Sequence, residues 1–324
     1  MDIEFLPGFI TYDFGPKRLL FAVLHSTTSL KYTPRGDVGA DLLAVHLAMD
    51  IGCKAVISTT PREEEFGIDF NRLPPPKSLA LNMFDVFEKN ENKEKILWYF
   101  KKYSWVATTT EDYADKLKVY KSFWSYVGKL SNSKSPIVFV HMQDPVLRNF
   151  PSLIDVISLG IEKRRIEEAI AKLNKKYRKT FGNMKKDFAD FSASHAKYYY
   201  KNSILQAAGT LNPKGFSGKT REDHEKMLKR VDDLGFNKIY RELKNSFTFE
   251  KYLRAVKYIE ERVPLKVTSS LNFSGKYALG TKKFLRDFHR KGIELEVNGF
   301  LSEVRTDLGI EIIKDFLQFT GLSI

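Results

Sequence analysis

Two short runs of consecutive apolar residues stand out along an otherwise mixed chain. Residues 19–24 read Leu-Leu-Phe-Ala-Val-Leu, and residues 136–140 read Pro-Ile-Val-Phe-Val. Continuous apolar runs of this length indicate strands that are buried on both faces of a sheet. Turn signals before the first run suggest an edge hairpin there. The same reading predicts further strands at residues 54–59, 105–109, 154–157, 265–268 and 292–298.

Helical periodicity fills most of the chain between these strands. Apolar residues are dense from residue 40 to 51, and further helical stretches are expected at 93–102, 111–130 and 281–290. A last helix is expected from residue 306 to about Gly321. Strands that alternate with helices are typical of the α/β class. We therefore expect a three-layer α/β/α fold, with a mixed central sheet and helices on both faces.

The pattern changes at residue 161. Apolar side chains at Ile166, Ile170, Leu173 and Tyr177 fall on one face of a long helix, and three more helical stretches follow up to residue 262. The α/β pattern resumes at Pro264. The sequence thus predicts a catalytic α/β domain made of residues 1–160 and 263–324, interrupted by a helical insertion at 161–262.

Charge is concentrated in this middle segment. The whole chain of 324 residues has a formal net charge of +13, and residues 161–262 alone carry 25 basic and 14 acidic side chains, a net +11. Such a field could attract nucleic acid, a membrane surface or an acidic substrate. The alternative is that lysines merely solvate the helices. Nucleic acid is therefore a partner that we consider but do not favour.

Composition also limits the cellular setting. No run of 18 apolar residues exists, so we expect no membrane span. The start of the chain, Met1-Asp2-Ile3-Glu4, is acidic and lacks the features of a signal peptide. A single cysteine, Cys53, excludes an intramolecular disulfide and fits a reducing compartment. A cytoplasmic protein is the expectation; its oligomeric state is left open.

Two of the predicted buried strands end in histidine. His25 follows the first apolar run and His141 the second, and open α/β proteins place their sites at this carboxyl edge of the sheet. A carboxylate, Asp37 or one turn later Asp41, lies at the entry of the next helix. Two imidazoles and one carboxylate with an open fourth position are the ligand pattern of catalytic zinc. The sequence therefore predicts a bound Zn²⁺.

A catalytic zinc site needs a base, and the strand at residues 292–298 can supply it. Glu294 and Glu296 occupy alternate positions and share one face. We expect Glu296 to take the proton of a water whose pKa the metal lowers to about 7. Arg62, Asn71 and Arg72 lie near strand ends and could hold an anionic substrate group, because a guanidinium binds a carboxylate with two hydrogen bonds. The alternative is that Arg72 pairs with Asp69 and only fixes a loop.

Several segments together resemble the N-formylglutamate amidohydrolase family, relatives of the zinc carboxypeptidases with a phosphorylase/hydrolase-like fold. The similarity covers roughly residues 1–160 and 263–324, and it leaves the helical middle unexplained. The segments occur in the family's order: Leu24-His25-Ser26, Asp37-Val38-Gly39-Ala40-Asp41-Leu42-Leu43-Ala44, Ile68-Asp69-Phe70-Asn71-Arg72, Val138-Phe139-Val140-His141, Asn272-Phe273-Ser274-Gly275-Lys276-Tyr277 and Ile293-Glu294-Leu295-Glu296-Val297-Asn298.

The resemblance implies a role for each candidate residue. The chain departs from the family at Thr27 (usually glycine), at Glu294 (usually glutamine) and in the 272–275 loop, which lacks an expected proline; these changes touch the substrate pocket more than the metal. By this resemblance, zinc would be bound by His25, Asp37 and His141, and Glu296 would be the general base and later the acid. Arg62 would polarise the scissile carbonyl or hold a second carboxylate. Asn71 and Arg72 would anchor a substrate carboxylate, in a pocket to which Asn272 and Gly275 belong.

The expected function is that of a zinc-dependent amidohydrolase. It would cleave an amide or formamide bond of a small carboxylate-bearing substrate, such as N-formylglutamate or another N-acyl amino acid or peptide. Two alternatives are a deacylase of charged tRNA, which would use the basic insertion to bind RNA, and a non-catalytic binding protein on a hydrolase scaffold. RNA binding would show a steep dependence on salt.

Overall fold

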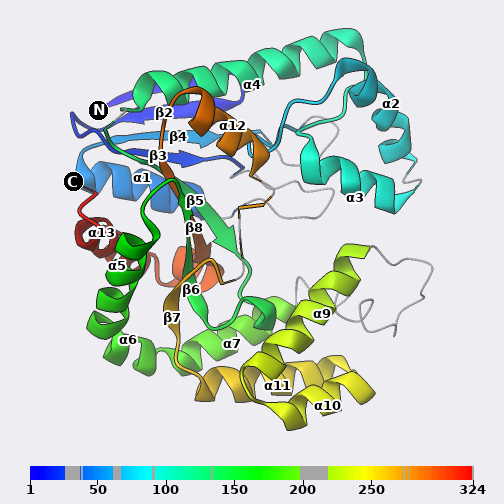
Figure 1. The fold of residues 1–324 in the computed structure, drawn as a ribbon, viewed down its shortest axis with the longest axis vertical. Coiled ribbons are helices and arrows are strands. Elements are labelled where there is room, and N and C mark those ends of the chain that lie inside the picture. Colours follow the sequence, from blue (N-terminus) through cyan, green and yellow to red (C-terminus); the bar gives the residue numbers. More distant parts are fainter. Residues whose placement is uncertain are drawn as a thin grey trace.

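The central element is a mixed eight-stranded sheet (Figure 1). The computed structural model describes residues 1–25, 37, 39–60, 67–89, 92–132, 134–197, 218–271, 273, 275–276 and 278–322. Strand order across the sheet is β1-β2-β4-β3-β5-β8-β6-β7. The strands are β1 (Asp2–Leu6), β2 (Phe9–Asp13), β3 (Leu20–Val23), β4 (Lys54–Ser58), β5 (Ile137–Gln143), β6 (Ser152–Leu159), β7 (Lys266–Ser269) and β8 (Gly292–Asn298).

Strand direction determines where the site can form. The four central strands β4, β3, β5 and β8 are parallel, while β2 and β6 run antiparallel to β4 and β8 on either side. β1 and β2 form the antiparallel hairpin that was expected at the start of the chain. The carboxyl ends of β3, β5 and β8 therefore meet at one edge, as the sequence predicts for an α/β protein.

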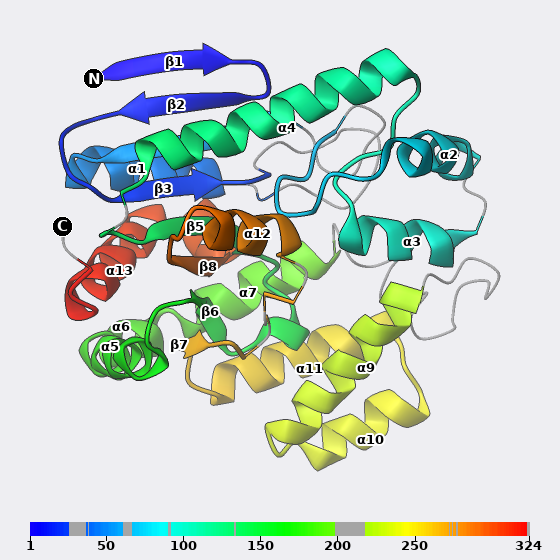
Figure 2. The same cartoon turned by 45° about the horizontal axis from the view of Figure 1, so that its top comes forward.

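Helices cover both faces of the sheet, which confirms the α/β class and agrees with the three-layer arrangement (Figures 1 and 2). The α-helices in the described part of the chain are α1 (Ala40–Ile51), α2 (Lys77–Glu88), α3 (Lys93–Lys102), α4 (Thr110–Leu130), α5 (Lys163–Lys176), α6 (Arg178–Asn183), α7 (Lys185–His195), α9 (Gly218–Asp233), α10 (Asn237–Asn245), α11 (Phe249–Arg262), α12 (Leu279–Asp287) and α13 (Thr306–Phe319). A 3-10 turn η1 (Leu147–Asn149) follows β5, and a π-helical turn η4 (Phe300–Val304) follows β8.

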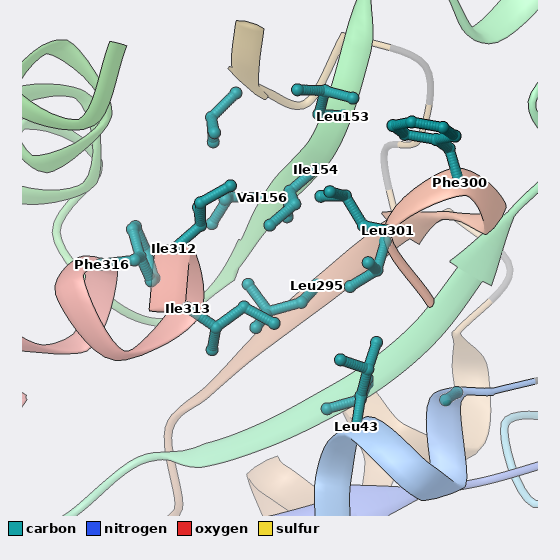
Figure 3. Close-up of a cluster of buried hydrophobic side chains, with 14 of the residues drawn as sticks. Leu43, Leu153, Ile154, Val156, Leu295, Phe300, Leu301, Ile312, Ile313 and Phe316 are labelled. Atoms are coloured by element: carbon teal, nitrogen blue, oxygen red, sulfur yellow. The ribbon is translucent and has the colours of Figure 1, made fainter. Parts of the chain in front are cut away.

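One face of the sheet packs against α1, α13 and η4. α1 buries Ala40, Leu43, Ala44, Leu47 and Ala48, at the i, i+3, i+4, i+7, i+8 spacing of a helix face that rests on a sheet. Leu43 belongs to the same buried cluster as side chains from β6, β8, η4 and α13, and Figure 3 shows it on the side of Leu295 and Ile313. This apolar layer holds α1, and with it the residues at its N-terminus, against β3 and β5.

The opposite face packs against α4 and α12. Aromatic rings dominate this layer: Phe70 and Phe123 stack with centroids 4.0 Å apart, and Trp124 and Phe284 stack at 4.6 Å. Aromatic pairs of this kind contribute about 0.5–1.5 kcal/mol beyond their buried area. The amide of Gly280, at the start of α12, donates to the carbonyl of Asn71 at 3.0 Å and places the 70–72 loop against this helix.

The middle segment is helical in its described part and shares the core of the sheet. α5 contacts β7 and α13, while α9 contacts η1, the turn after β5. Side chains such as Leu173 and Tyr252 belong to the same buried cluster as Val138 of β5. The helices of this segment therefore pack against the elements that carry the site.

One predicted strand is absent. Residues 105–109 form no strand, and their backbone groups bond to neighbouring helices instead. The Tyr99 hydroxyl donates to the carbonyl of Trp105, Lys116 Nζ donates to that of Val106 at 2.9 Å, and the amide of Ala107 donates to the carbonyl of Ala80 at 3.2 Å. The buried apolar side chains of Trp105 and Val106 pack among helices, which produces the same apolar pattern as a strand.

None of the helices within the described ranges is long and apolar enough to cross a membrane.

Candidate metal centre

The three predicted ligands lie at the expected edge of the sheet. His25 follows β3, His141 lies within β5, and Asp37 stands just before α1. The amide of Asp37 donates to the carbonyl of His25 at 2.9 Å, and that of Ala40 donates to the carbonyl of Asp37 at 3.0 Å. These bonds tie the start of α1 to the end of β3. The carboxylate thus comes to the strand end from the adjacent helix.

Gly39 makes this approach possible. Its φ of +83° lies in the left-handed region that favours glycine. A Cβ atom at this position would lie 2.9 Å from the carbonyl oxygen of Ser302 in η4. The chain can therefore turn from Asp37 into α1 while packed directly against η4.

Distances within the group fit a shared ion. Asp37 Oδ2 lies 3.0 Å from His25 Nδ1 and 2.9 Å from His141 Nδ1, and the two imidazole centroids are 4.8 Å apart. Two atoms bound at about 2 Å to one tetrahedral zinc lie about 3.3 Å from each other. All three residues are at least 95% buried. Asp41, the second choice, is partly exposed on α1 and is not part of the group.

The polar atoms of the group need a further partner. His25 Nδ1 is buried and makes no hydrogen bond with good geometry within the described structure, although it lies close to Asp37 Oδ2. A buried polar atom without a partner costs about 1–3 kcal/mol. A cation between the three residues would satisfy it. His25, Asp37 and His141 could therefore hold a metal ion.

The electrostatics of the group favour charge. Burial opposes ionisation of Asp37, but the neighbouring His25 and His141 outweigh it and lower the pKa of this carboxyl. Burial likewise disfavours a charged His141, yet Asp37 and Glu294 raise its pKa well above the ordinary value. The carboxylates thus create a strongly negative setting that attracts positive charge, from a proton or from a metal ion.

Glu294 lies directly beside this group. Its Oε1 atom is 3.4 Å from His141 Nε2 and 3.5 Å from Asn71 Nδ2. The Asn71 side chain is fixed in turn, because the Thr281 hydroxyl donates to Asn71 Oδ1 at 2.6 Å. Burial tends to raise the pKa of Glu294, but the imidazole of His141 and the amide of Asn71 more than compensate and lower it.

Glu296 occupies the next position on the same face. It pairs in register with His141 on β5 and with Asp155 on β6. Its side chain remains partly exposed and has no hydrogen bond or ion pair to any described residue. Desolvation raises its pKa well above the ordinary value; His141 opposes this, while Glu294 and other nearby carboxylates add to it.

The predicted substrate residues are placed differently from one another. Asn71 faces Glu294 and Thr281, and Gly275, with a φ of +60°, packs beside Glu294 Oε2. Arg72 Nε donates to the carbonyl of Phe100 at 3.1 Å and lies 3.9 Å from Asp69 Oδ2, the pairing weighed above as an alternative. Arg62 and Asn272 lie outside the described residues.

Sequence reasoning missed Asp155. This fully buried carboxylate accepts hydrogen bonds from the Thr268 hydroxyl at 2.7 Å and from the amides of Leu271 and Phe273 at 3.0 and 3.2 Å. It therefore holds the start of the loop that contains Gly275. Its signal was a single acidic residue inside the apolar run Leu153-Ile154-Asp155-Val156-Ile157. Glu294 was also missed, because it was treated only as a departure from a family pattern.

Comparisons with known proteins gave no match to a family model, a curated protein or a solved structure. Function is therefore argued from the chain's own residues.

Proposed function

We propose that the protein is a zinc-dependent amidohydrolase that acts on an amide or formamide bond of a small, carboxylate-bearing substrate. One observation carries the proposal: Glu296 has a carboxyl group with no partner among the described residues, on the strand next to His141 and in register with it. A carboxyl group so placed beside a potential metal centre is suited to proton transfer.

His25, Asp37 and His141 would hold the ion. Two imidazole nitrogens and one carboxylate oxygen suit zinc, and three protein ligands leave a position for substrate or water. When bound, the ion would supply Lewis acidity, which polarises a carbonyl group and makes a water more acidic.

Glu296 would move the proton. As a carboxylate it would accept a proton from the attacking water, and as an acid it would deliver this proton to the leaving nitrogen. A base is most effective when its pKa lies near the working pH, and the raised pKa of Glu296 moves it in this direction. Its partly exposed position lets it reach a substrate without displacing a ligand.

The substrate would be anionic and small. Arg62 and Arg72 are the arginines proposed to hold its carboxylate, with the Asn272–Gly275 loop as part of the pocket. Arg72 would have to exchange contacts that it makes within the protein, such as that with the Phe100 carbonyl, for the substrate carboxylate. N-formyl and N-acyl amino acids, including N-formylglutamate, are the substrates to test first.

The decisive variant is Glu296→Gln. In zinc-loaded protein assayed against a panel of N-formyl and N-acyl amino acids, we expect turnover to fall by about 10²–10⁴-fold, the usual contribution of a general base. Zinc stoichiometry, measured by elemental analysis, should not change because Glu296 is not a ligand. Glu162→Gln, at an exposed residue before α5, is the control. Wild-type turnover in Glu296→Gln would refute the proposal.

A further inference from the structure

His141 lies between two carboxylates. Its Nδ1 atom is 2.9 Å from Asp37 Oδ2, and its Nε2 atom is 3.4 Å from Glu294 Oε1. A neutral imidazole carries its proton on one nitrogen and a lone pair on the other, and only the lone pair can bind a metal. What faces the second nitrogen therefore decides which nitrogen is available to an ion.

We propose that Glu294 is a positioning residue that keeps the proton of His141 on Nε2 and thereby directs the Nδ1 lone pair toward the ion. This inference rests on the proposed metal site. Histidine ligands commonly donate their other N–H group to a carboxylate, which fixes the ring and increases the basicity of the ligand nitrogen. Glu294 lies on the Nε2 side, opposite the shared Asp37 carboxylate.

Glu294 is contacted by the Asn71 side chain, which is held in turn by a residue of α12. The Thr281 hydroxyl of α12 donates to Asn71 Oδ1 at 2.6 Å, which leaves Asn71 Nδ2 directed at Glu294 Oε1. The backbone is locked as well, because the Gly280 amide donates to the Asn71 carbonyl at 3.0 Å. The contacts thus run from Thr281 through Asn71 and Glu294 to His141.

This arrangement gives Asn71 a role other than the one expected from the sequence. Both polar atoms of its amide face protein groups: Oδ1 faces Thr281 and Nδ2 faces Glu294. Asn71 is 93% buried, so these contacts are shielded from water. We infer that Asn71 acts on the metal centre through Glu294.

Burial of a carboxylate at position 294 costs free energy, and a functional role would explain why the carboxylate is present. Glu294 is 98% buried, and its Oε2 atom has no hydrogen-bond partner in the described structure. His141 Nε2 likewise has no hydrogen-bond partner of good geometry, although Glu294 Oε1 lies 3.4 Å away, and an amide oxygen could accept a hydrogen bond from it as well. A carboxylate accepts it more strongly, because hydrogen bonds to an ionised acceptor are about twice as strong as neutral ones. Glutamate at position 294 therefore orients His141 more strongly than glutamine would, although glutamine would be less costly to bury.

The test compares zinc affinity, measured by competition with a chromogenic chelator, across a set of variants of the full chain. Loss of an outer partner of a ligand histidine typically weakens metal binding by about 10–100-fold, and we expect this for Glu294→Ala. Glu294→Gln should bind zinc with intermediate affinity, because its amide oxygen still accepts a hydrogen bond. Thr281→Val should weaken binding a few fold, and this loss should disappear in the double variant with Glu294→Ala. The matched control is Glu260→Gln, at a buried glutamate of α11, and should bind zinc as the wild type does.

The outcomes separate the two proposals. Wild-type protein that binds no zinc would refute the proposed function. Wild-type protein that binds zinc, together with unchanged affinity in Glu294→Ala, would overturn the positioning role alone; so would equal losses in Glu294→Ala and Glu294→Gln. A second readout is the visible spectrum of the cobalt-loaded protein, which should change in Glu294→Ala and be largely restored in Glu294→Gln. If Glu294→Ala does not fold, Glu294→Gln and Thr281→Val carry the test, and wild-type affinity in both would overturn the inference.

Discussion

Two buried clusters of the molecule each contain a glutamate, and they differ in whether the buried carboxyl groups are favoured as neutral or as charged groups. In the helical middle segment, Glu260 of α11 lies against α7, with its Oε1 atom 3.0 Å from Ser192 Oγ. The Ser192 hydroxyl also lies 2.6 Å from the carbonyl oxygen of Pro145. A hydroxyl has one proton to donate, and Pro145 can only accept. Ser192 can therefore fully stabilise only one of the two acceptors, and burial raises the pKa of Glu260 well above its ordinary value, which favours the neutral carboxyl.

The electrostatics of the candidate metal centre favour charged carboxylates instead. Asp37 and Glu294 are as deeply buried as Glu260, yet nearby imidazoles lower the pKa of both. The difference lies in the partner. A single hydroxyl does not compensate for the desolvation free energy of a buried carboxylate, whereas imidazoles or a cation can. Burial alone therefore does not identify a site. Convergent groups of opposite charge do.

The largest expected effect comes from removing a ligand of the charged cluster. His141→Ala should weaken zinc binding by more than about a hundredfold, beyond the usual loss for an outer-sphere partner. Elemental analysis and chelator competition would measure it. The matched control is His195→Ala, which removes a buried histidine from α7, 3.8 Å from Asp144 and outside the metal group. Equal zinc binding by His141→Ala and the wild type would show that the cluster is only structural.

For the cluster around Glu260 we predict an effect on the pH dependence of stability, and none on zinc binding. A carboxyl whose pKa is higher in the folded state than its ordinary value of 4.5 stabilises the fold fully below that value and loses this contribution as the pH rises towards the folded pKa. Wild-type stability should therefore fall, relative to Glu260→Gln, by about 1.4 kcal/mol for each pH unit above 4.5 until the folded pKa is reached. Urea unfolding of both proteins at several pH values tests this. A difference that does not change with pH would mean that Glu260 is ionised in the folded protein.

The sequence predicted the convergence of His25, Asp37 and His141 better than the surroundings of this group, for a physical reason. His25 and His141 each follow an apolar run, and parallel strands bring their carboxyl ends to one edge, so a local pattern was enough to place them together. Asn71, which contacts Glu294, comes from a loop 223 residues earlier in the chain, and it is held by Thr281 of α12. No local pattern records such a contact. The wrong strand at 105–109 has the same origin, since burial among helices and burial in a sheet select the same apolar residues.

The smallest expected effect lies in the backbone that carries Asp37. Gly39→Ala would force a Cβ atom into a left-handed turn and to within 2.9 Å of the Ser302 carbonyl, which should cost about 1–3 kcal/mol of unfolding free energy. Because Asp37 lies two residues earlier, we also expect zinc affinity to fall by about three- to tenfold, equivalent to roughly 1 kcal/mol. The control is Gly182→Ala in α6, where a Cβ atom would meet nothing within 4 Å and the helix should gain stability. If Gly39→Ala loses stability but keeps wild-type zinc affinity, the turn supports the fold without positioning the carboxylate, and the charged cluster tolerates more movement than its short distances indicate.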